Sequence, residues 1–269
     1  MAAVYRNSYV TLAATRASDG NGGLFDATPD AELLVQTPGT DGFEVHARRM
    51  IEHPMRTWLN PNKYPLLTRS WVFQERLLSP RVLHFVNQEL MWECKTCMTC
   101  ECGWLSGYYQ QGFISFKESH SQALQGESEH DLQIAWRAIV EEYGPLKLTV
   151  SSDRLPALSG VARTFQALKP ATYLAGLWRD SLVHDMTWRT LERKTRPEWR
   201  APSWSWASVD SCQIDYPFKP RKIKEFHSDV SIKDVKCAIA GEDTTGRMSS
   251  AYIVLSGRII RGVLKNRRL

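Results

Sequence analysis

Residues 66–85, LLTRSWVFQERLLSPRVLHF, decide the fold because they place a helix pattern and a strand pattern on either side of one proline. Apolar and polar residues recur at helical spacing from Trp71 to Leu78, and Pro80 ends that pattern. The segments RVLHF and ELMWEC (residues 89–94) then look like two strands around the turn VNQ. We therefore expect a short helix followed by a hairpin.

The segments before and after this stretch also have residue patterns that predict helices and strands. Ser8–Thr15 is β-branched and apolar, which is typical of a buried strand. Residues 128–145 form an amphipathic pattern with Ser128 as N-cap, and residues 151–168 form a second helix pattern. The sequence further predicts a helix over 173–188, a strand with Trp204 and Trp206 on one face, and strand-like runs such as 251–260.

Composition restricts the class of protein. The chain has 269 residues, 43% hydrophobic and 23% charged, which is typical of a globular protein with a sizeable core. The net charge of +5 is spread along the chain, so we expect no nucleic-acid partner. No apolar run approaches the roughly 20 residues of a membrane span, and the N-terminus carries no secretory pattern. We therefore expect a cytoplasmic protein, in which disulfides are rare.

Four cysteines, Cys94, Cys97, Cys100 and Cys102, lie within MWECKTCMTCECGW (residues 91–104). Four thiolates this close in sequence could wrap one Zn²⁺, but zinc sites are usually built from two separated pairs. Iron–sulfur motifs have a different spacing. The pattern favours buried free cysteines that pack beneath a turn, and a zinc site formed by all four is the alternative.

Several blocks of the sequence resemble the fungal heterokaryon incompatibility (HET) domain. The family's hallmark block is similar to RSWVFQERLLSPRVLHFVNQELMWEC (residues 69–94), and VYRNSYVTLAATRASDGNGGLF (residues 4–25) resembles an earlier block. Three shorter blocks, DRLPALSGVA, YLAGLW and APSWSWAS, resemble segments that follow the domain. The resemblance covers roughly residues 1–210, and the family's first strand blocks have no counterpart in this sequence.

The resemblance implies a domain organisation and a biological role. Residues 1–120 would be the C-terminal part of a HET domain, an α/β fold similar to TIR domains and flavodoxins and here lacking its N-terminal part. Residues 121–200 would be a helical region and 201–269 a β-rich tail. The implied role is the programmed cell death that follows fungal nonself recognition, with a homo-oligomer or other incompatibility proteins as partners.

Some TIR domains cleave NAD with one glutamate that lies four residues after a tryptophan, and Trp71 and Glu75 have that spacing. Residues four apart share a helix face, so Trp71 could wall a pocket beside the Glu75 carboxylate. A carboxylate there would stabilise the positive charge that develops on the ribose. The resemblance thus implies an NAD glycohydrolase, with NAD as substrate and no firmly implied cofactor. The alternatives are a non-enzymatic interaction module and an inactive truncated fragment.

Overall fold

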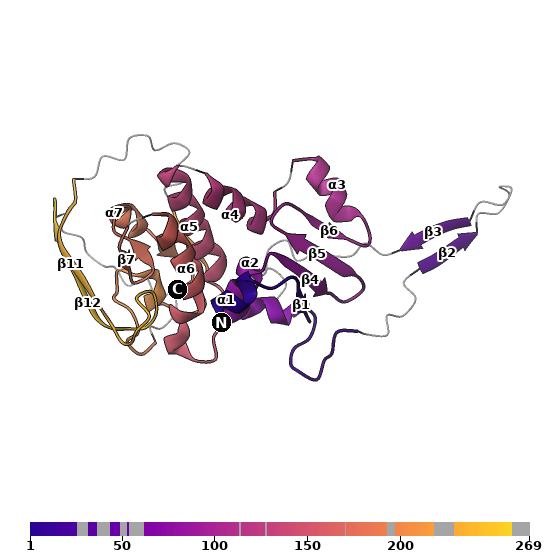
Figure 1. The fold of residues 1–269 in the computed structure, drawn as a ribbon, viewed down its shortest axis with the longest axis horizontal. Coiled ribbons are helices and arrows are strands. Elements are labelled where there is room, and N and C mark those ends of the chain that lie inside the picture. The colour runs from indigo at the N-terminus through magenta and orange to yellow at the C-terminus, as the bar shows by residue number, and fades with distance from the viewer. Residues whose placement is uncertain are drawn as a thin grey trace, which may run out of the picture.

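The computed structural model describes residues 1–25, 32–36, 44–48, 53, 62–112, 114–126, 128–169, 171–192, 197–217 and 229–259. Helices and strands follow one another along the chain as labelled in Figure 1. In chain order they are α1 (Ala2–Arg6), β1 (Thr11–Ala13), β2 (Glu32–Gln36), β3 (Glu44–Arg48), η1 (Pro65–Thr68), α2 (Ser70–Leu78), β4 (Arg81–Phe85), β5 (Leu90–Cys94), β6 (Met98–Cys100), α3 (Trp104–Gln110), α4 (Phe116–Gln125), α5 (Glu129–Tyr143), η2 (Ser151–Asp153), α6 (Pro156–Leu168), β7 (Tyr173–Leu174), β8 (Leu177–Trp178), α7 (Leu182–Asp185), β9 (Arg189–Thr190), η3 (Trp206–Ser208), β10 (Ile214–Asp215), β11 (Ser231–Ile239) and β12 (Met248–Ser256).

A four-stranded mixed sheet has the strand order β1-β4-β5-β6 (Figure 1). Strand β1 pairs in parallel with β4, and α2 precedes β4 in the chain, as a helical crossover between parallel strands does. Strands β4, β5 and β6 form an antiparallel meander. The predicted helix and hairpin of residues 66–94 are thus confirmed.

Strand β1 is shorter and more exposed than the sequence predicts. The predicted buried strand spans Ser8–Thr15, but only Thr11–Ala13 pair, and Leu12 is 56% exposed. Within the described sheet β1 has a single neighbour, β4, so its outer edge carries no strand.

Helix α2 joins the sheet to the helical region. Its Gln74 side chain accepts a hydrogen bond from the Gly160 backbone N–H of α6 at 2.5 Å. A Cβ atom at Gly160 would lie 2.6 Å from both Ala2 Cβ and Gln74 Oε1, so only glycine permits this approach. Glycine is therefore needed at position 160 because a larger residue would clash with α1 and α2.

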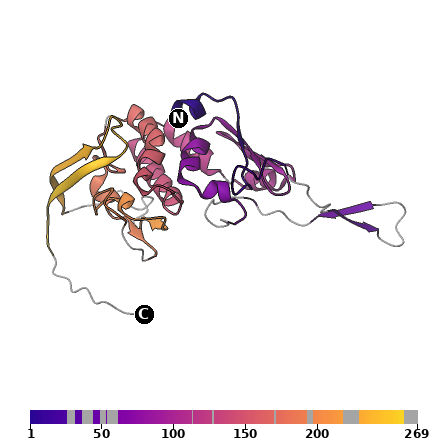
Figure 2. The same cartoon turned by 90° about the horizontal axis from the view of Figure 1, so that it is seen from below.

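The main core lies among α5, α6 and the segments that follow them, the pink and orange region in the left half of Figure 2. Trp136, Trp178, Trp206, Tyr143 and Phe165 are each at most 1% exposed. Their rings meet mainly edge-to-face, the geometry that aromatic quadrupoles prefer. Among the described residues, most of the buried aromatic side chains therefore lie in this region rather than beside the sheet.

The N-terminus of α5 confirms the predicted cap. The Ser128 hydroxyl accepts a hydrogen bond from the Asp131 backbone N–H, and the helix ends before Gly144. The next helix, α6, has no such cap: it begins after Leu155 with Pro156 in its first turn, and its N-cap has no side-chain hydrogen bond.

The prediction of a helix over residues 173–188 is wrong. The segment forms the hairpin β7–β8 and the short helix α7. The two residues between the strands, Ala175 and Gly176, have φ of 53° and 94°, the left-handed values that a type I′ hairpin turn needs. Two consecutive left-handed residues cannot continue a right-handed helix.

The prediction of a strand through Trp204 and Trp206 is also wrong. Trp206 begins the 3₁₀-helix η3, and the Ser205 hydroxyl accepts a hydrogen bond from the Ala207 backbone N–H at its start. Trp136 Nε1 and Trp206 Nε1 both donate to the Gly176 carbonyl oxygen at 2.9 Å. This tryptophan is therefore held by a turn rather than by a sheet.

The antiparallel hairpin β11–β12 follows the helical region, at the margin of Figure 2. One face packs on the core through the buried residues Val235 and Met248, and the other presents Tyr252 and Val254, which are 48% and 46% exposed.

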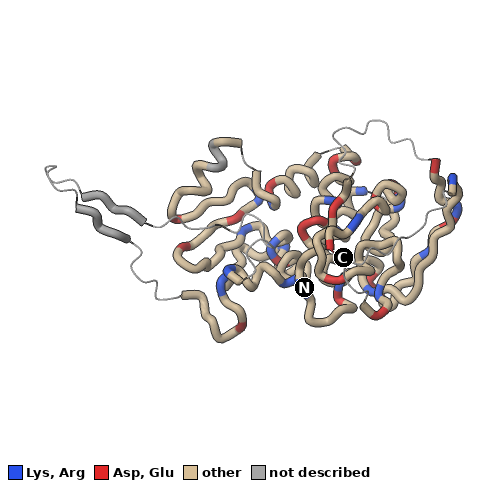
Figure 3. Tube along the Cα trace, turned by 180° about the vertical axis from the view of Figure 1, so that it is seen from behind, with Lys and Arg blue, Asp and Glu red and all other residues tan. Residues whose placement is uncertain are grey.

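Basic and acidic residues are interspersed along the helical region (Figure 3). In the described parts of the chain, no helix combines the length and the apolar character that crossing a membrane requires.

Candidate functional site

Trp71 and Glu75 both lie on α2, four residues apart as the sequence predicts. Trp71 packs partly buried against the main core, and its Nε1 atom donates to Asp153 Oδ2 at 3.3 Å. The indole is thus fixed in place beside the start of the helical region.

The Glu75 carboxylate is half-buried next to α1. Burial raises its pKa, while a hydrogen bond from the Tyr5 hydroxyl and the positive charge of Arg69 oppose that rise. Burial, and then the charge of Glu75, raise the pKa of Tyr5 in turn. The site therefore holds a poorly hydrated carboxylate with a phenol donor and a guanidinium nearby.

A second group of charged residues connects α2 to the sheet. The Arg76 guanidinium donates two hydrogen bonds to the Glu93 carboxylate, at 2.7 and 2.8 Å. His84 Nε2 lies 3.2 Å from the same carboxylate, and His84 Nδ1 lies 2.8 Å from Thr15 Oγ1. Lys117 Nζ donates to the Arg76 carbonyl oxygen at 2.8 Å.

This network has the order of a hydroxyl, an imidazole and a carboxylate, but it is closed to substrates. Thr15 and His84 are 0% exposed and Glu93 is 1% exposed. Burial lowers the pKa of His84 despite its contact with Glu93, so the ring stays neutral. The network therefore stabilises the join between α2, β4 and β5. The His84 side chain lies toward the core, where it is 0% exposed.

The four clustered cysteines divide into two pairs. Cys94 and Cys97 lie at one end of the β5–β6 hairpin, with their sulfurs 3.5 Å apart. Cys100 and Cys102 lie at the other end of β6, with their sulfurs 3.3 Å apart. Strand β6 separates the pairs, and the Cα atoms of Cys97 and Cys100 are about 10 Å apart at 3.3 Å per residue. None of the six cysteines forms a disulfide, and the four clustered ones are only partly buried.

Cys94 is the most acidic of the thiols whose pKa is shifted. Burial raises its pKa, but hydrogen bonds from the Thr96 hydroxyl and backbone outweigh burial and lower the pKa to about 7. Burial raises the pKa of Cys97, and the neighbouring Cys94 raises it further. The pair therefore combines one reactive thiolate with one protonated thiol.

Alkylation tests this assignment. We expect iodoacetamide to modify Cys94 fastest, with a rate that rises through about pH 7 as the thiolate forms. Cys237 is the internal control, because burial raises its pKa to about 11 and should keep it slow over the same range. Peptide mass spectrometry at a series of pH values measures both rates. Equal rates at Cys94 and Cys237 at pH 7 would contradict the assignment.

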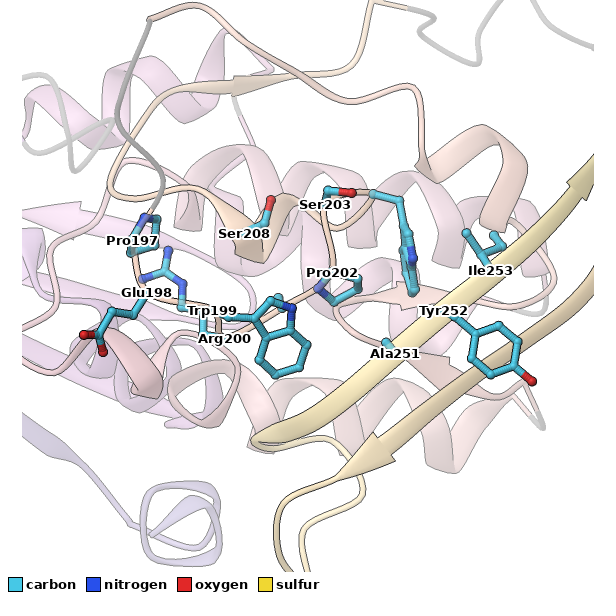
Figure 4. Close-up of a pocket in the computed structure, with 12 residues that line it drawn as sticks. Pro197, Glu198, Trp199, Arg200, Pro202, Ser203, Ser208, Ala251, Tyr252 and Ile253 are labelled. Atoms are coloured by element: carbon cyan, nitrogen blue, oxygen red, sulfur yellow. The ribbon is translucent and has the colours of Figure 1, made fainter. Parts of the chain in front are cut away.

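A groove lies between the segment before η3 and the hairpin β11–β12 (Figure 4). Its volume is about 610 Å³. Trp199 is 54% exposed and lies with Pro202 on one wall; on the β12 side, the Tyr252 ring points away from Trp199 (Figure 4). The lining residues are Pro197, Glu198, Trp199, Arg200, Ala201, Pro202, Ser203, Trp204, Ser208, Ala251, Tyr252 and Ile253. The sequence did not single out this groove, because its two walls are about 50 residues apart in the chain and meet only in the fold.

Comparison of the chain with protein-family models, with curated proteins and with solved structures found no match.

Proposed function

We propose that this chain is a HET-type cell-death protein that cleaves NAD, with Glu75 as the catalytic carboxylate. The observation that carries the proposal is the half-buried Glu75 side chain on the same helix as Trp71, next to a parallel β1–β4 pair. The resemblance of residues 4–25 and 69–94 to the HET domain, and of that domain to TIR domains, supplies the choice of substrate.

The proposed chemistry is hydrolysis of the bond between nicotinamide and ribose. The bond breaks with its electrons leaving on nicotinamide, which becomes neutral, and positive charge develops on the ribose. Glu75 stabilises that charge, and its partial burial makes the interaction stronger than it would be in water. Water then adds to the ribose and releases a proton, so the products are ADP-ribose and nicotinamide.

The hydrogen bond from Tyr5 has a role in this proposal. Its hydroxyl holds the Glu75 carboxylate on the side of α2 that faces α1. The indole of Trp71, fixed by Asp153, forms the neighbouring wall. The protein would act in the cytoplasm of a fungal cell after nonself recognition, as a homo-oligomer or with other incompatibility proteins.

The groove at Trp199 favours a second candidate, a non-enzymatic interaction module. Exposed tryptophan and tyrosine are typical anchors of protein interfaces, and prolines 197 and 202 stiffen the wall that carries Trp199. In that case cell death would follow from binding, and Glu75 would only hold α1 against α2.

Growth arrest of a fungal host that expresses the chain separates the two candidates. We expect Glu75→Gln to abolish toxicity, because the amide removes the charge but keeps the size of the side chain. Trp199→Ala should leave toxicity unchanged. Glu242→Gln is the matched control, since Glu242 is exposed in the turn of the β11–β12 hairpin.

The reverse outcome supports the interaction module: toxicity that is lost in Trp199→Ala and kept in Glu75→Gln. Toxicity that survives both substitutions contradicts both candidates. Equal protein levels, checked by immunoblotting, are required for each comparison.

A further inference from the structure

Four metal-ligating side chains meet beside the β5–β6 hairpin. They are His53, Glu89, Cys100 and Cys102, and one ligand atom from each lies within 4.8 Å of all the others. His53 precedes η1, Glu89 lies in the turn between β4 and β5, and the two cysteines flank the end of β6. The group therefore joins segments that are up to 49 residues apart in the chain.

The distances in this group are close to those around one tetrahedral ion. Cys100 Sγ and Cys102 Sγ are 3.3 Å apart, and Cys102 Sγ lies 3.4 Å from His53 Nε2 and 3.6 Å from Glu89 Oε1. Zinc bonds of about 2.0–2.3 Å place neighbouring ligand atoms about 3.3–3.8 Å apart. His53 Nε2 and Glu89 Oε1, at 2.6 Å, would separate by less than about 1 Å to admit the ion.

The surroundings hold these ligands in place. The His53 and Glu89 side chains are 2% and 0% exposed. The His53 ring stacks on Trp104 with centroids 4.9 Å apart, and its Nδ1 atom is buried without a hydrogen-bond partner among the described residues. The Cys102 backbone N–H donates to Glu89 Oε2 at 2.8 Å. The ligands are thus oriented before any ion arrives.

A backbone N–H group points at one of the two sulfurs. Leu105 N–H donates to Cys100 Sγ at 3.4 Å. Gly103 makes this turn possible, because its φ of +76° suits glycine and strains other residues. Such hydrogen bonds stabilise charge on a thiolate, the form in which cysteine binds metal.

We propose that His53, Glu89, Cys100 and Cys102 bind one Zn²⁺ ion. Two thiolates and an imidazole favour zinc over the harder ions Mg²⁺ and Ca²⁺, which prefer oxygen ligands. Four protein ligands fill all positions of a tetrahedral site, so the ion is structural. It connects His53 to the β5–β6 hairpin. The site differs from the four-cysteine alternative, because Cys94 and Cys97 do not belong to this group.

Metal content of the purified chain tests the proposal. After incubation with Zn²⁺ and removal of free ion, we expect inductively coupled plasma mass spectrometry to find about one zinc per chain. Cys102→Ser and His53→Ala should lose it. Cys97→Ser is the matched control from the other pair and should keep it. Co²⁺ in place of zinc should give a thiolate charge-transfer band that Cys97→Ser keeps and Cys102→Ser lacks.

A second variant at position 53 distinguishes the loss of a ligand from misfolding as the cause of metal loss. His53→Cys supplies another zinc ligand at the same position and should restore binding that His53→Ala loses. Circular dichroism checks that each variant is folded. No zinc on the folded wild-type chain would overturn the proposal. So would zinc that His53→Ala keeps and Cys97→Ser loses, since that result assigns the ion to the cysteines alone.

Discussion

Replacing Glu93 with glutamine should lower the free energy of unfolding by about 3–5 kcal/mol. The substitution keeps the size of the side chain but removes the charge that Arg76 and His84 contact. The Arg76 guanidinium, whose side chain is 16% exposed, would lose its hydrogen-bonded counter-ion and keep only the weaker effect of the Glu142 charge. Removing one partner of a buried pair costs more than the pair contributes, because the other charge is left desolvated. Urea unfolding of the two proteins at pH 7 measures the difference.

The same network predicts how the stability of the wild-type chain depends on pH. Burial raises the pKa of Glu93, but Arg76 and His84 outweigh burial and hold its pKa well below the usual range. Its contribution is therefore present above the unfolded-state pKa of about 4.3 and is lost as the pH falls toward the folded-state pKa. His84, whose pKa burial lowers, adds a loss that begins below about pH 6.5.

The glutamine variant should lack the part of this acid dependence that Glu93 supplies. Glu242→Gln, which changes an exposed carboxylate, should unfold like the wild type. A Glu93→Gln chain within 1 kcal/mol of wild type, with the same acid dependence, would show that the network contributes little.

Gly176→Ala is the second substitution from which we expect a large effect, a loss of about 2–5 kcal/mol. Gly176 has a φ of +94°, so alanine would be strained by about 1–2 kcal/mol. The added Cβ atom would also lie 2.8 Å from Trp206 Nε1, and overpacking of this kind adds about 1–3 kcal/mol. Two tryptophans donate hydrogen bonds to the Gly176 carbonyl, so a shift of the turn disturbs both.

Gly241→Ala provides the control for this prediction. Gly241 is exposed in the β11–β12 turn, and a Cβ atom there would meet nothing within 4 Å. Its effect should stay within about 0.5 kcal/mol. Thermal unfolding followed by near-ultraviolet circular dichroism reports on the tryptophans directly. Equal melting temperatures for the two alanine variants would refute the role assigned to the Gly176 turn.

The sequence predicts the helices and strands whose own residue pattern decides their secondary structure. Helix α5 follows from one apolar stripe and a serine cap, and β4 and β5 follow from two strand-like runs around a short turn. The hairpin β7–β8 could not be predicted in this way. Its residues YLAGLW have an apolar content that also suits a helix, and only the left-handed turn at Ala175 and Gly176 excludes one.

The candidate sites likewise include one that the sequence predicts and one that it does not. Trp71 and Glu75 could be placed on one helix because a spacing of four residues has a fixed meaning there. The grouping of Cys100 and Cys102 with His53 and Glu89 could not, because no spacing rule links a residue to another 49 positions away. The cysteine pattern favoured buried free cysteines, with a four-cysteine zinc site as the alternative. It could not predict the group with His53 and Glu89, because that group depends on which end of β6 each sulfur lies at.

Release of nicotinamide from NAD tests the proposed function most directly. The purified chain, Glu75→Gln and Glu242→Gln would each be incubated with NAD, and the products separated by chromatography. We expect the wild type and Glu242→Gln to form nicotinamide and ADP-ribose in equal amounts, and Glu75→Gln to form neither above the rate without protein. If the wild type releases no nicotinamide, or if Glu75→Gln releases it as fast as the wild type does, Glu75 is not the carboxylate of an NAD-cleaving site.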